Sequence, residues 1–313
     1  MRLVRHINDL PYRQLAAGSV VTIGAFDGVH LGHRQLLRRV VETAREEGLN
    51  AVAMSFEPTP KEFFLRESAP ARLMRFREKY EALAERDMDL FFCPRFDASM
   101  RDISAASFIW QILVHGLNAR HLVVGDDFRF ARHREGSLDD LIRVGPALNL
   151  DVEQVPSVVV EGIRVSSTAI REALAEGDLD RATALLGRPY RMSGRIIRGR
   201  RVGRTLGYPT ANVDLRRRQS AVAGIFAVRV RGLAEGPVDG VASVGTRPTF
   251  DLSKPLLEVH LFNFDREIYG EYIHVEFIEH LRNEEKFESI DDLVAQMRLD
   301  EENARSALAG RPA

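Results

Sequence analysis

The sequence predicts two domains of different class: an α/β domain with a parallel sheet, followed by a small antiparallel β-barrel that ends in a helix. In the first half, short, continuously apolar segments alternate with amphipathic helical segments, which is typical of a parallel sheet covered on both faces. Beyond about residue 187, apolar and polar residues alternate with a period of two, and glycine or proline separates the segments. This change of pattern predicts the domains 1–186 and 187–313.

The first domain is expected to alternate strands with helices. We predict strands over 20–23, 51–56, 90–93 and 122–124, and helices over 33–47, 76–85 and 105–117. In the first helix, Leu37, Val40 and Ala44 share an apolar face, and Gly48 is suited to end the helix. The strand order is left open. Because ligands of such sheets bind beyond the carboxyl ends of the strands, we expect functional residues in the segments that follow them.

The second domain is expected to contain strands over 225–231, 257–261 and 273–277. Each shows strict alternation of apolar and polar residues. A final amphipathic helix is predicted over about 289–308, with Ser289 as its N-cap.

Composition limits the function classes. The chain has 44 Lys and Arg against 45 Asp and Glu, so its net charge gives no general attraction to nucleic acid or to an acidic membrane. The single cysteine, Cys93, excludes an intrachain disulfide, and its apolar neighbours predict that it is buried. The N-terminus lacks the apolar core of an export signal, and no apolar run is long enough to span a bilayer. We therefore expect a cytoplasmic protein with neither a nucleic-acid nor a membrane partner; its oligomeric state is open.

The most informative motif is the segment 24–33, Gly-Ala-Phe-Asp-Gly-Val-His-Leu-Gly-His. It joins an expected strand to an expected helix, where unpaired amides and the helix dipole favour an anion. Two histidines three residues apart add donors for charge that develops during a reaction. A solvated turn is the alternative, and zinc is disfavoured because no cysteine or Glu-x-x-His partner is near. The candidate ligands of a nucleotide phosphate here are Gly24, Phe26, Asp27, His30, Gly32 and His33.

A second candidate phosphate site lies at 164–171, where Ser166, Ser167 and Thr168 precede a helical run. Taken alone, N-capping is the better explanation of these hydroxyls. However, Arg164 and Arg171 flank them, and arginine suits polyphosphate oxygens. Two such helix starts in one domain predict a site that holds both ends of a triphosphate.

A third motif covers Asp126, Asp127, Phe128 and Arg129, directly after an expected strand. The acids could hold a ribose, a flavin edge or Mg²⁺. Alternatively, the segment is a polar turn whose aromatic residues lie in the core. The residues do not decide among these readings.

The β domain carries two further candidates. If the chain is extended there, Thr210 and Asn212 point to the same side and could serve one Mg²⁺, near Gly203. Local hydrogen bonds of the Thr and Asn side chains are at least as good an explanation. Glu258 faces away from the apolar side of its strand, so it is either a solvent-facing residue or a general base, and spacing cannot separate the two.

Two arginine-rich stretches, 195–204 and 216–218, lack the interleaved aromatic residues that stack on bases. We therefore interpret them as solvated or phosphate-facing loops.

Taken together, six segments resemble the bacterial bifunctional riboflavin kinase/FMN adenylyltransferases (FAD synthetases) in their family order. They are 24–33, 125–130, 166–171, 207–212, 240–250 and 257–287. The resemblance implies a Rossmann-like nucleotidyltransferase domain and a riboflavin kinase-like barrel. One departure is Ala131, where the family usually has glycine.

The resemblance implies two reactions. The barrel would transfer the γ-phosphoryl group of ATP to riboflavin and give FMN, and the α/β domain would transfer AMP from a second ATP to FMN and give FAD. His30 and His33 would stabilise the α-phosphate, and Ser167, Thr168 and Arg171 would hold the leaving pyrophosphate, with Arg164 nearby.

Glu258 would be the base of the kinase reaction, and Thr210 and Asn212 would hold Mg²⁺ and the ATP phosphates. Asp126, Asp127, Phe128 and Arg129 are expected at the flavin. The alternatives are a chain that retains one of the two activities, a class I aminoacyl-tRNA synthetase-like enzyme, and a flavin- or RNA-binding regulator.

Overall fold

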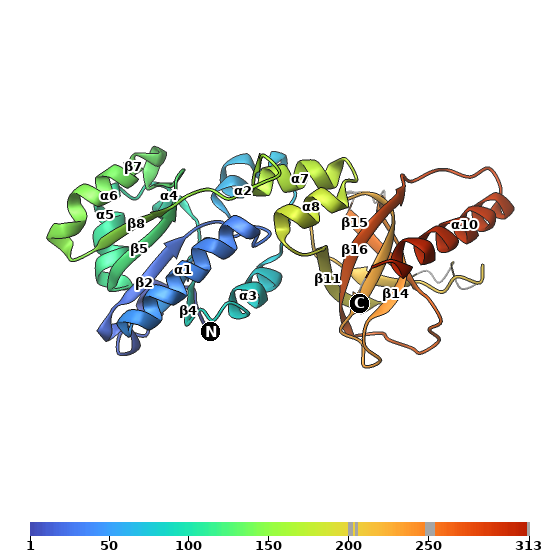
Figure 1. The fold of residues 1–313 in the computed structure, drawn as a ribbon, viewed down its shortest axis with the longest axis horizontal. Coiled ribbons are helices and arrows are strands. Elements are labelled where there is room, and N and C mark those ends of the chain that lie inside the picture. The colour runs from blue at the N-terminus through green and yellow to red at the C-terminus, as the bar shows by residue number, and fades with distance from the viewer. Residues whose placement is uncertain (200–202, 204–205, 248–253, 312–313) are drawn as a thin grey trace. The chain divides into compact units, whose positions relative to one another are not determined.

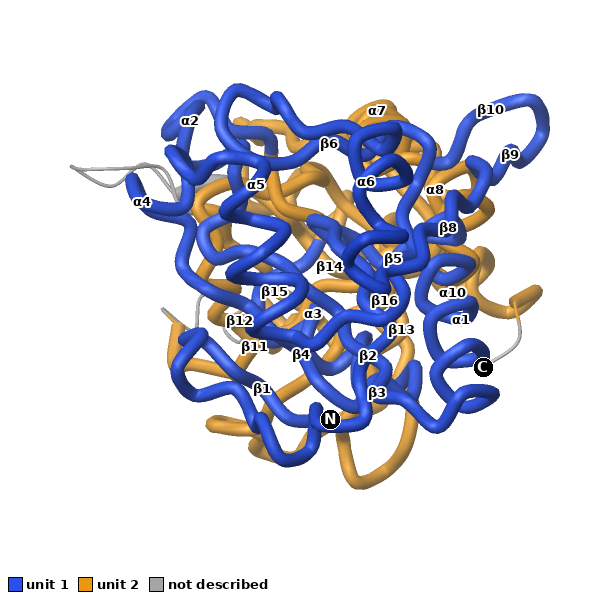
Figure 2. The backbone as a smooth tube through the Cα atoms, turned by 90° about the vertical axis from the view of Figure 1, so that its left-hand side faces the viewer, with its two compact units in different colours: residues 1–70, 74–165 blue, residues 71–73, 166–313 orange. Residues whose placement is uncertain are grey.

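The computed structural model describes residues 1–199, 203, 206–247 and 254–311. The chain forms two compact units, drawn in separate colours in Figure 2. Unit 1 contains residues 1–70 and 74–165, and unit 2 contains residues 71–73 and 166–313. In the part of the chain that is described, no helix is long and apolar enough to cross a membrane.

Unit 1 is built on a six-stranded parallel sheet, which confirms the predicted class (Figure 1). Its strands, in spatial order, are β1 (Arg2–Val4), β4 (Leu90–Phe92), β3 (Asn50–Met54), β2 (Ser19–Ile23), β5 (Ala119–Gly125) and β8 (Asp151–Val155). All five pairings are parallel, so the carboxyl ends of the strands lie at one edge. The two edge strands, β1 and β8, were not predicted, because one is very short and the other is largely polar.

Both faces of this sheet are covered, because successive side chains of a strand point to opposite sides. Val20 packs against α1 (Leu31–Glu47) and α3 (Phe76–Ala84) on one face. Val21 packs on the other face, against the helical segment Phe108–Gly116 and α6 (Leu138–Val144). The predicted helix 105–117 is therefore present, although most of it has the wider π-helical hydrogen bonding. Cys93 is fully buried, as predicted.

The shorter elements of unit 1 connect these layers. They are η1 (Ile7–Asp9), η2 (Gln14–Ala17), α2 (Pro60–Leu65), η3 (Arg66–Ser68), α4 (Ala98–Arg101), α5 (Ala105–Ser107), β6 (Arg129–Phe130), η5 (Arg132–Arg134), β7 (Gly136–Ser137), η6 (Gly145–Leu148), β9 (Val159–Val160) and β10 (Ile163–Arg164).

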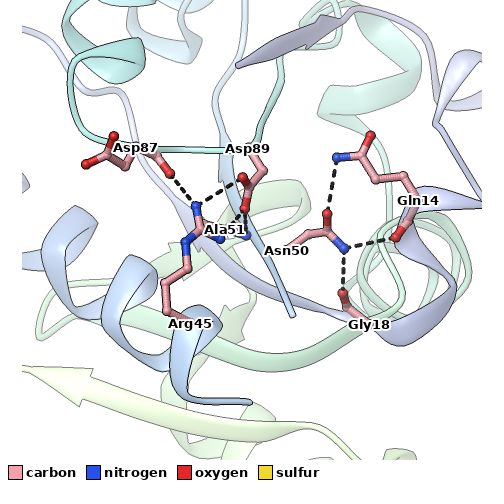
Figure 3. Close-up of polar contacts among 7 residues, drawn as sticks. All are labelled: Gln14, Gly18, Arg45, Asn50, Ala51, Asp87 and Asp89. Carbon is pink, nitrogen blue, oxygen red and sulfur yellow. Dashed lines mark hydrogen bonds and ion pairs between the residues drawn. The ribbon is translucent and has the colours of Figure 1, made fainter. Parts of the chain in front are cut away.

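A polar network ties the amino ends of the central strands together (Figure 3). Asp89 accepts hydrogen bonds from the backbone N–H of Ala51 and from the guanidinium group of Arg45. Asn50 donates to the carbonyls of Gln14 and Gly18. This end of the sheet is thus occupied by structural contacts, which leaves the carboxyl edge for ligands.

Unit 2 contains two helices, a closed antiparallel barrel and a final helix, which confirms the predicted barrel. The helices are α7 (Ser167–Ala175) and α8 (Leu179–Leu186). The barrel strands, in spatial order, are β11 (Tyr190–Ile197), β12 (Ala211–Asp214), β15 (Lys254–Leu261), β14 (Val238–Arg247), β13 (Gly224–Arg231) and β16 (Tyr272–Arg282). Helix α10 (Ile290–Ala309) packs Ala304 and Leu308 against the barrel, and its N-cap is Ser289, as predicted.

Arg217 corrects one prediction. We expected 216–218 to be solvated or phosphate-facing, but Arg217 is only 8% exposed. Its guanidinium group donates to the carbonyls of Arg72 and Leu73 and contacts the Tyr190 hydroxyl. A buried cation is tolerated because these oxygens replace its water. Arg217 thereby holds the three-residue segment 71–73 in unit 2.

Candidate active sites

The two histidines of the first motif form one stacked pair at the start of α1. His30 is the N-cap, and its Nδ1 atom accepts a hydrogen bond of 3.3 Å from the backbone N–H of His33. The ring centroids lie 3.7 Å apart, with the planes 15° from parallel. Because Nδ1 of His30 is an acceptor, a neutral His30 carries its ring proton on Nε2, where it can be donated to a ligand.

The turn before the pair has an unusual backbone. Phe26 and Val29 have φ angles of 47° and 43°, in the left-handed region that bulky side chains rarely adopt. Phe26 is fully buried, and its ring meets the His33 ring edge-on at 5.3 Å. Asp27 is 8% exposed and accepts a hydrogen bond from the backbone N–H of Met74. Asp27 therefore has a structural role, whatever it does for a ligand.

A side chain would fit less well at Gly24 than at Gly32. A Cβ atom at Gly24 would lie 3.2 Å from the Phe26 ring, which is a tight contact. A Cβ atom at Gly32 would meet the His30 ring at 3.4 Å, which is ordinary packing.

The surroundings of His33 favour an uncharged ring. Burial, followed by the proximity of His30 and Lys79, holds the pKa of His33 well below its usual value. The Nδ1 atom of His33 is buried and has no hydrogen-bond partner among the residues described. His33 is therefore neutral at neutral pH in the free chain.

Lys79 and Ser55 belong to this site and were missed by the sequence analysis. Lys79 lies on α3, is 2% exposed and donates to the Ser55 hydroxyl at 3.4 Å. Its spacing of three from Phe76 and four from Leu83 places it on the apolar face of the helix, and this was the available signal. Ser55 directly follows β3, at the ligand edge of the sheet.

The third motif is held by contacts within unit 1. The carboxylate of Asp126 accepts hydrogen bonds from the Ser157 hydroxyl (2.8 Å) and from Arg164 (2.7 Å). Asp127 lies 3.6 Å from the same guanidinium group. Arg164 is thus paired with acidic side chains at the carboxyl end of β5.

The aromatic residues of this motif face the core. Phe128 stacks on Phe130, which is buried, while Arg129 is exposed. Ala131 follows with φ 65° and ψ −177°, a conformation that is nearly restricted to glycine. The departure at this position therefore introduces local strain.

An aromatic group at the same edge was also missed. Phe56 and Phe96 follow β3 and β4, and their ring centroids lie 5.4 Å apart. The Phe96 ring also contacts the Phe63 ring, at 5.3 Å. Phe64 joins the group and is 60% exposed. These rings meet edge-to-face and form an apolar group near the carboxyl ends of two strands.

The second phosphate motif lies at the start of α7, in unit 2. Ser166 is the N-cap and accepts a hydrogen bond from the backbone N–H of Ala169, so capping is confirmed. Ser167 and Thr168 occupy the first turn. Arg171 donates to the carbonyls of Ala71 and Ser167. The histidine turn and Arg164 belong to unit 1, so a triphosphate site that joins the two motifs stays a prediction.

A second candidate site lies in the barrel. Glu258 pairs in register with Asn212 of β12 on one side and with Ser243 of β14 on the other. Side chains of directly paired residues lie on the same face of a sheet, so these three form a polar row. Ser243 was missed, because β14 does not alternate strictly between apolar and polar residues and was not among the predicted strands.

Glu258, Ser243, Thr210 and Gly203 line one pocket of about 540 Å³. Leu257 and Val259 are fully buried on the opposite side of the strand, as predicted. The structure therefore places Glu258 at a pocket and not on an open surface.

Gly199 and Gly203 approach the two candidate metal ligands, Asn212 and Thr210. A Cβ atom at Gly199 would lie 2.4–2.6 Å from the amide group of Asn212, and one at Gly203 would lie 3.3 Å from the Thr210 hydroxyl. Asn212 is 4% exposed. The arginine-rich stretch 195–204, which we expected to be solvated or phosphate-facing, lies partly outside the described residues, at 200–202 and 204. The same holds for 248–250 of the segment 240–250.

The wall of this pocket includes a buried ion pair that was not predicted. Arg282 of β16 makes two hydrogen bonds to Asp300 of α10, at 2.8 and 2.7 Å. Gln296 donates to the same carboxylate. These hydrogen bonds are the main cause of the raised pKa of Arg282. The Arg282–Asp300 pair therefore fixes α10 to β16.

Two family models match the chain, FAD synthetase over residues 13–169 and riboflavin kinase over residues 186–308. The bifunctional riboflavin kinase/FMN adenylyltransferase of Escherichia coli (strain K12) is 46% identical over 305 residues, which cover 97% of each chain. The protein of the same name from Haemophilus influenzae is 43% identical over 307 residues, covering 98% of this chain and 99% of its own.

A crystal structure described as a macrolide-efflux protein from Streptococcus pneumoniae matches with a TM-score of 0.83 at 31% identity. It covers 97% of this chain and 98% of that chain. The similarity thus extends over both compact units and is not confined to the histidine turn.

Proposed function

Because the chain belongs to the family of bifunctional riboflavin kinase/FMN adenylyltransferases, we propose which of its residues carry each reaction. Both activities predicted from the sequence are confirmed. The flavokinase part phosphorylates riboflavin with ATP, and the FAD synthetase part transfers AMP from ATP to FMN.

For adenylyl transfer, the FMN phosphate is already a competent nucleophile, so the protein must align it and neutralise developing charge. His30 and His33 supply donors for the α-phosphate. The observation that carries this assignment is their stacked arrangement at the N-terminus of α1, beyond the carboxyl end of β2. The helix dipole and the open backbone amides favour the same anion.

The leaving pyrophosphate is assigned to Ser167, Thr168 and Arg171 at the start of α7. Arg171 lies one turn into this helix, and its guanidinium group suits the oxygens of a polyphosphate. Arg164 is a weaker ligand, since its contacts to Asp126 and Ser157 would have to be shared.

The test of the histidine pair uses the second activity of the chain as an internal control. Replacing His30 or His33 by alanine is expected to lower FAD formation from FMN on the order of 100-fold or more. Phosphorylation of riboflavin by the same variant stays at the wild-type rate. His115→Ala, an exposed histidine of the same unit, is the matched control. Undiminished FAD formation in both histidine variants overturns the assignment.

For the kinase reaction, the nucleophile is a neutral hydroxyl group, so a general base is useful. Glu258 takes this proton, because its strand places it at the pocket between Asn212 and Ser243. Thr210 and Asn212 offer the oxygen donors that Mg²⁺ prefers, and the close approach of Gly199 and Gly203 forms a cradle over them. When bound there, Mg²⁺ would neutralise charge on the ATP phosphates.

Glu258→Gln is expected to lower FMN formation from riboflavin on the order of 100-fold or more, while supplied FMN is still converted to FAD. Glu267→Gln, an exposed glutamate of the same unit, should leave both rates unchanged. Chelation of divalent ions should stop riboflavin phosphorylation. If Glu258→Gln phosphorylates riboflavin normally, Glu258 is not the base.

For the flavin of the adenylyltransferase, two surfaces are candidates. The first is the segment that we propose to hold the flavin, Asp126, Asp127, Phe128 and Arg129. The Phe128 ring also stacks on Phe130 and packs against the core. The exposed aromatic group around Phe64 could stack on the flavin ring instead. Comparing the KM for FMN in Asp127→Ala and Phe64→Ala separates the two.

Small-molecule substrates are riboflavin, FMN and ATP. We propose a cytoplasmic location without nucleic-acid or membrane partners, supported by the balanced charge of the chain.

A further inference from the structure

The segment that carries Thr210 is held against β15 by the side chain of His260. The ring nitrogen Nδ1 of this histidine lies 2.9 Å from the carbonyl oxygen of Pro209, the residue directly before Thr210. A carbonyl oxygen only accepts hydrogen bonds, so Nδ1 of His260 carries the hydrogen and donates it. The contact therefore fixes the tautomer of a neutral His260.

This hydrogen bond is made where the backbone pairing of β12 with β15 ends. Ala211 and Val259 form the last register pair at this end of the ladder. Pro209 has no N–H group, so it cannot extend the ladder by donating a hydrogen bond. The His260 side chain thus ties the chain to β15 beyond the last backbone pair.

His260 also belongs to the pocket that contains the proposed base. Glu258 and His260 are two positions apart on β15, so their side chains lie on the same face of the sheet. Both line the pocket of about 540 Å³, as do Thr210 and Tyr208. The Tyr208 ring meets the His260 ring edge-on at 5.1 Å, and the Tyr208 backbone N–H donates to the carbonyl of Gly203 at 2.8 Å. The segment before β12 is therefore held by contacts to both Gly203 and His260.

We propose that His260 is a positioning residue for riboflavin phosphorylation, which sets the Thr210 hydroxyl relative to Glu258 through the Pro209 carbonyl. This inference rests on the proposed roles of Thr210 and Glu258. Mg²⁺ demands nearly ideal octahedral geometry, so a ligand that is free to move binds it less well. Loss of the His260 hydrogen bond would therefore weaken the binding of Mg·ATP and not the binding of riboflavin.

The first test measures the contact itself in the full chain without nucleotide. NMR of the His260 ring nitrogens, assigned with His260→Ala, is expected to show the hydrogen on Nδ1. Backbone amides within 206–212 should exchange their hydrogens on the order of tenfold faster in His260→Ala than in the wild type. His260→Asn, whose amide nitrogen takes the place of Nδ1, should retain the slow exchange, whereas His260→Gln, whose donor lies one carbon further out, should not. A hydrogen on Nε2 alone, or equal exchange in the wild type and His260→Ala, overturns the proposal.

The second test separates positioning from a loss of folded protein. His260→Ala is expected to raise the KM for Mg·ATP on the order of tenfold and to leave the KM for riboflavin unchanged. A residue that only stabilised the fold would lower kcat through the folded fraction and leave both KM values in place. His260→Asn should restore the wild-type KM, and supplied FMN should still be converted to FAD at the wild-type rate. An unchanged KM for Mg·ATP in folded His260→Ala overturns the proposal.

His274→Ala is the matched control for this test. His274 is another half-buried histidine of the barrel, and its ring bonds to the Ser193 hydroxyl at 2.8 Å. Its removal also deletes a side-chain hydrogen bond between two strands. The variant should nevertheless leave the KM for Mg·ATP unchanged.

Thr210→Val distinguishes this proposal from the function on which it rests. Removal of the hydroxyl should raise the KM for Mg·ATP. In the double variant with His260→Ala, the increase should be smaller than the product of the two single effects, because both act through the same hydroxyl. If Thr210→Val leaves the KM unchanged, the proposed role of Thr210 fails, and the positioning role of His260 fails with it. If Thr210→Val raises the KM and the two effects multiply, the role of Thr210 stands and only the role of His260 is overturned.

Discussion

At the scale of single residues, His33 couples the stability of unit 1 to pH. Its pKa in the folded chain lies well below the ordinary value of 6.5, mainly because it is buried. The unfolded chain therefore binds a proton below about pH 6.5 that the folded chain does not bind. Stability from this group is complete above that pH and is lost as the pH falls, by up to about 1.4 kcal/mol per pH unit.

The His33→Gln variant should lose this dependence. Thermal unfolding of wild type and variant between pH 5 and 8 is expected to give melting temperatures that converge on the acidic side. The sign follows from the depressed pKa, since the proton binds to the unfolded state. Parallel curves over the whole range would contradict the prediction.

Ala131 offers a second test at this scale. Its φ of 65° with ψ near 180° is unfavourable for a residue with a Cβ atom. Ala131→Gly is expected to stabilise the chain by about 1 kcal/mol, because this backbone strain is relieved. Chemical denaturation measures the difference. Gly162→Ala provides the inverse control, since that glycine also has a positive φ and the substitution should destabilise.

Some single residues could be assigned to a site from the sequence, and buried charged residues could not. The histidine turn and Glu258 could be proposed from the sequence, because the turn follows a strongly apolar strand and Glu258 lies on a strand with strict alternation. Lys79 and Arg217 could not be proposed, because a charged side chain is buried only when distant carbonyl or hydroxyl groups replace its water. Those partners, such as Ser55, are brought together by the tertiary fold alone.

At the scale of elements, α10 depends on the Arg282–Asp300 pair. Both side chains are largely buried, at 16% and 6% exposed. Asp300→Ala is expected to destabilise unit 2 by about 3 kcal/mol, because it leaves a buried guanidinium group without its carboxylate. The double variant Arg282→Met and Asp300→Leu should recover much of this loss. Thermal unfolding and limited proteolysis of α10 measure the stability of both variants. An additive loss in the double variant would argue against a buried, unpaired guanidinium group as the cause.

The long elements were predicted well from their periodicity. Helix α1 and the strands β2, β3 and β13 lie within one or two residues of the expected limits. Short edge strands were missed, since three residues such as Arg2–Val4 carry no pattern. The order of the parallel strands could not be predicted, because it depends on how the crossovers pack and not on any one segment.

At the scale of the whole molecule, the division into units differs from the division into sequence domains. The predicted domains meet at 186 and 187, whereas α7 and α8 and the segment 71–73 belong to the compact unit that contains the barrel. Arg171 and Arg217 hold that segment through its carbonyls. The sequence could not reveal this, because the contact joins residues about 100 to 145 positions apart.

Arg217→Ala should therefore destabilise unit 2 by about 3 kcal/mol, since a buried side chain with several hydrogen bonds is removed. Arg218→Ala, at the exposed neighbour, should have little effect. Denaturation monitored through riboflavin phosphorylation distinguishes the two. Equal stability of both variants would show that the segment 71–73 is not held by Arg217.

The segment 71–73 has a consequence for any attempt to divide the gene. Unit 1 contains the residues on both sides of the segment 71–73. The chain therefore leaves unit 1, belongs to unit 2 for three residues and then returns to unit 1. A single break at any position between 165 and 187 separates the barrel from the carbonyls that Arg217 requires. Two independent polypeptides with both activities would thus need the barrel to find a new partner for that arginine, which favours keeping both reactions on one chain.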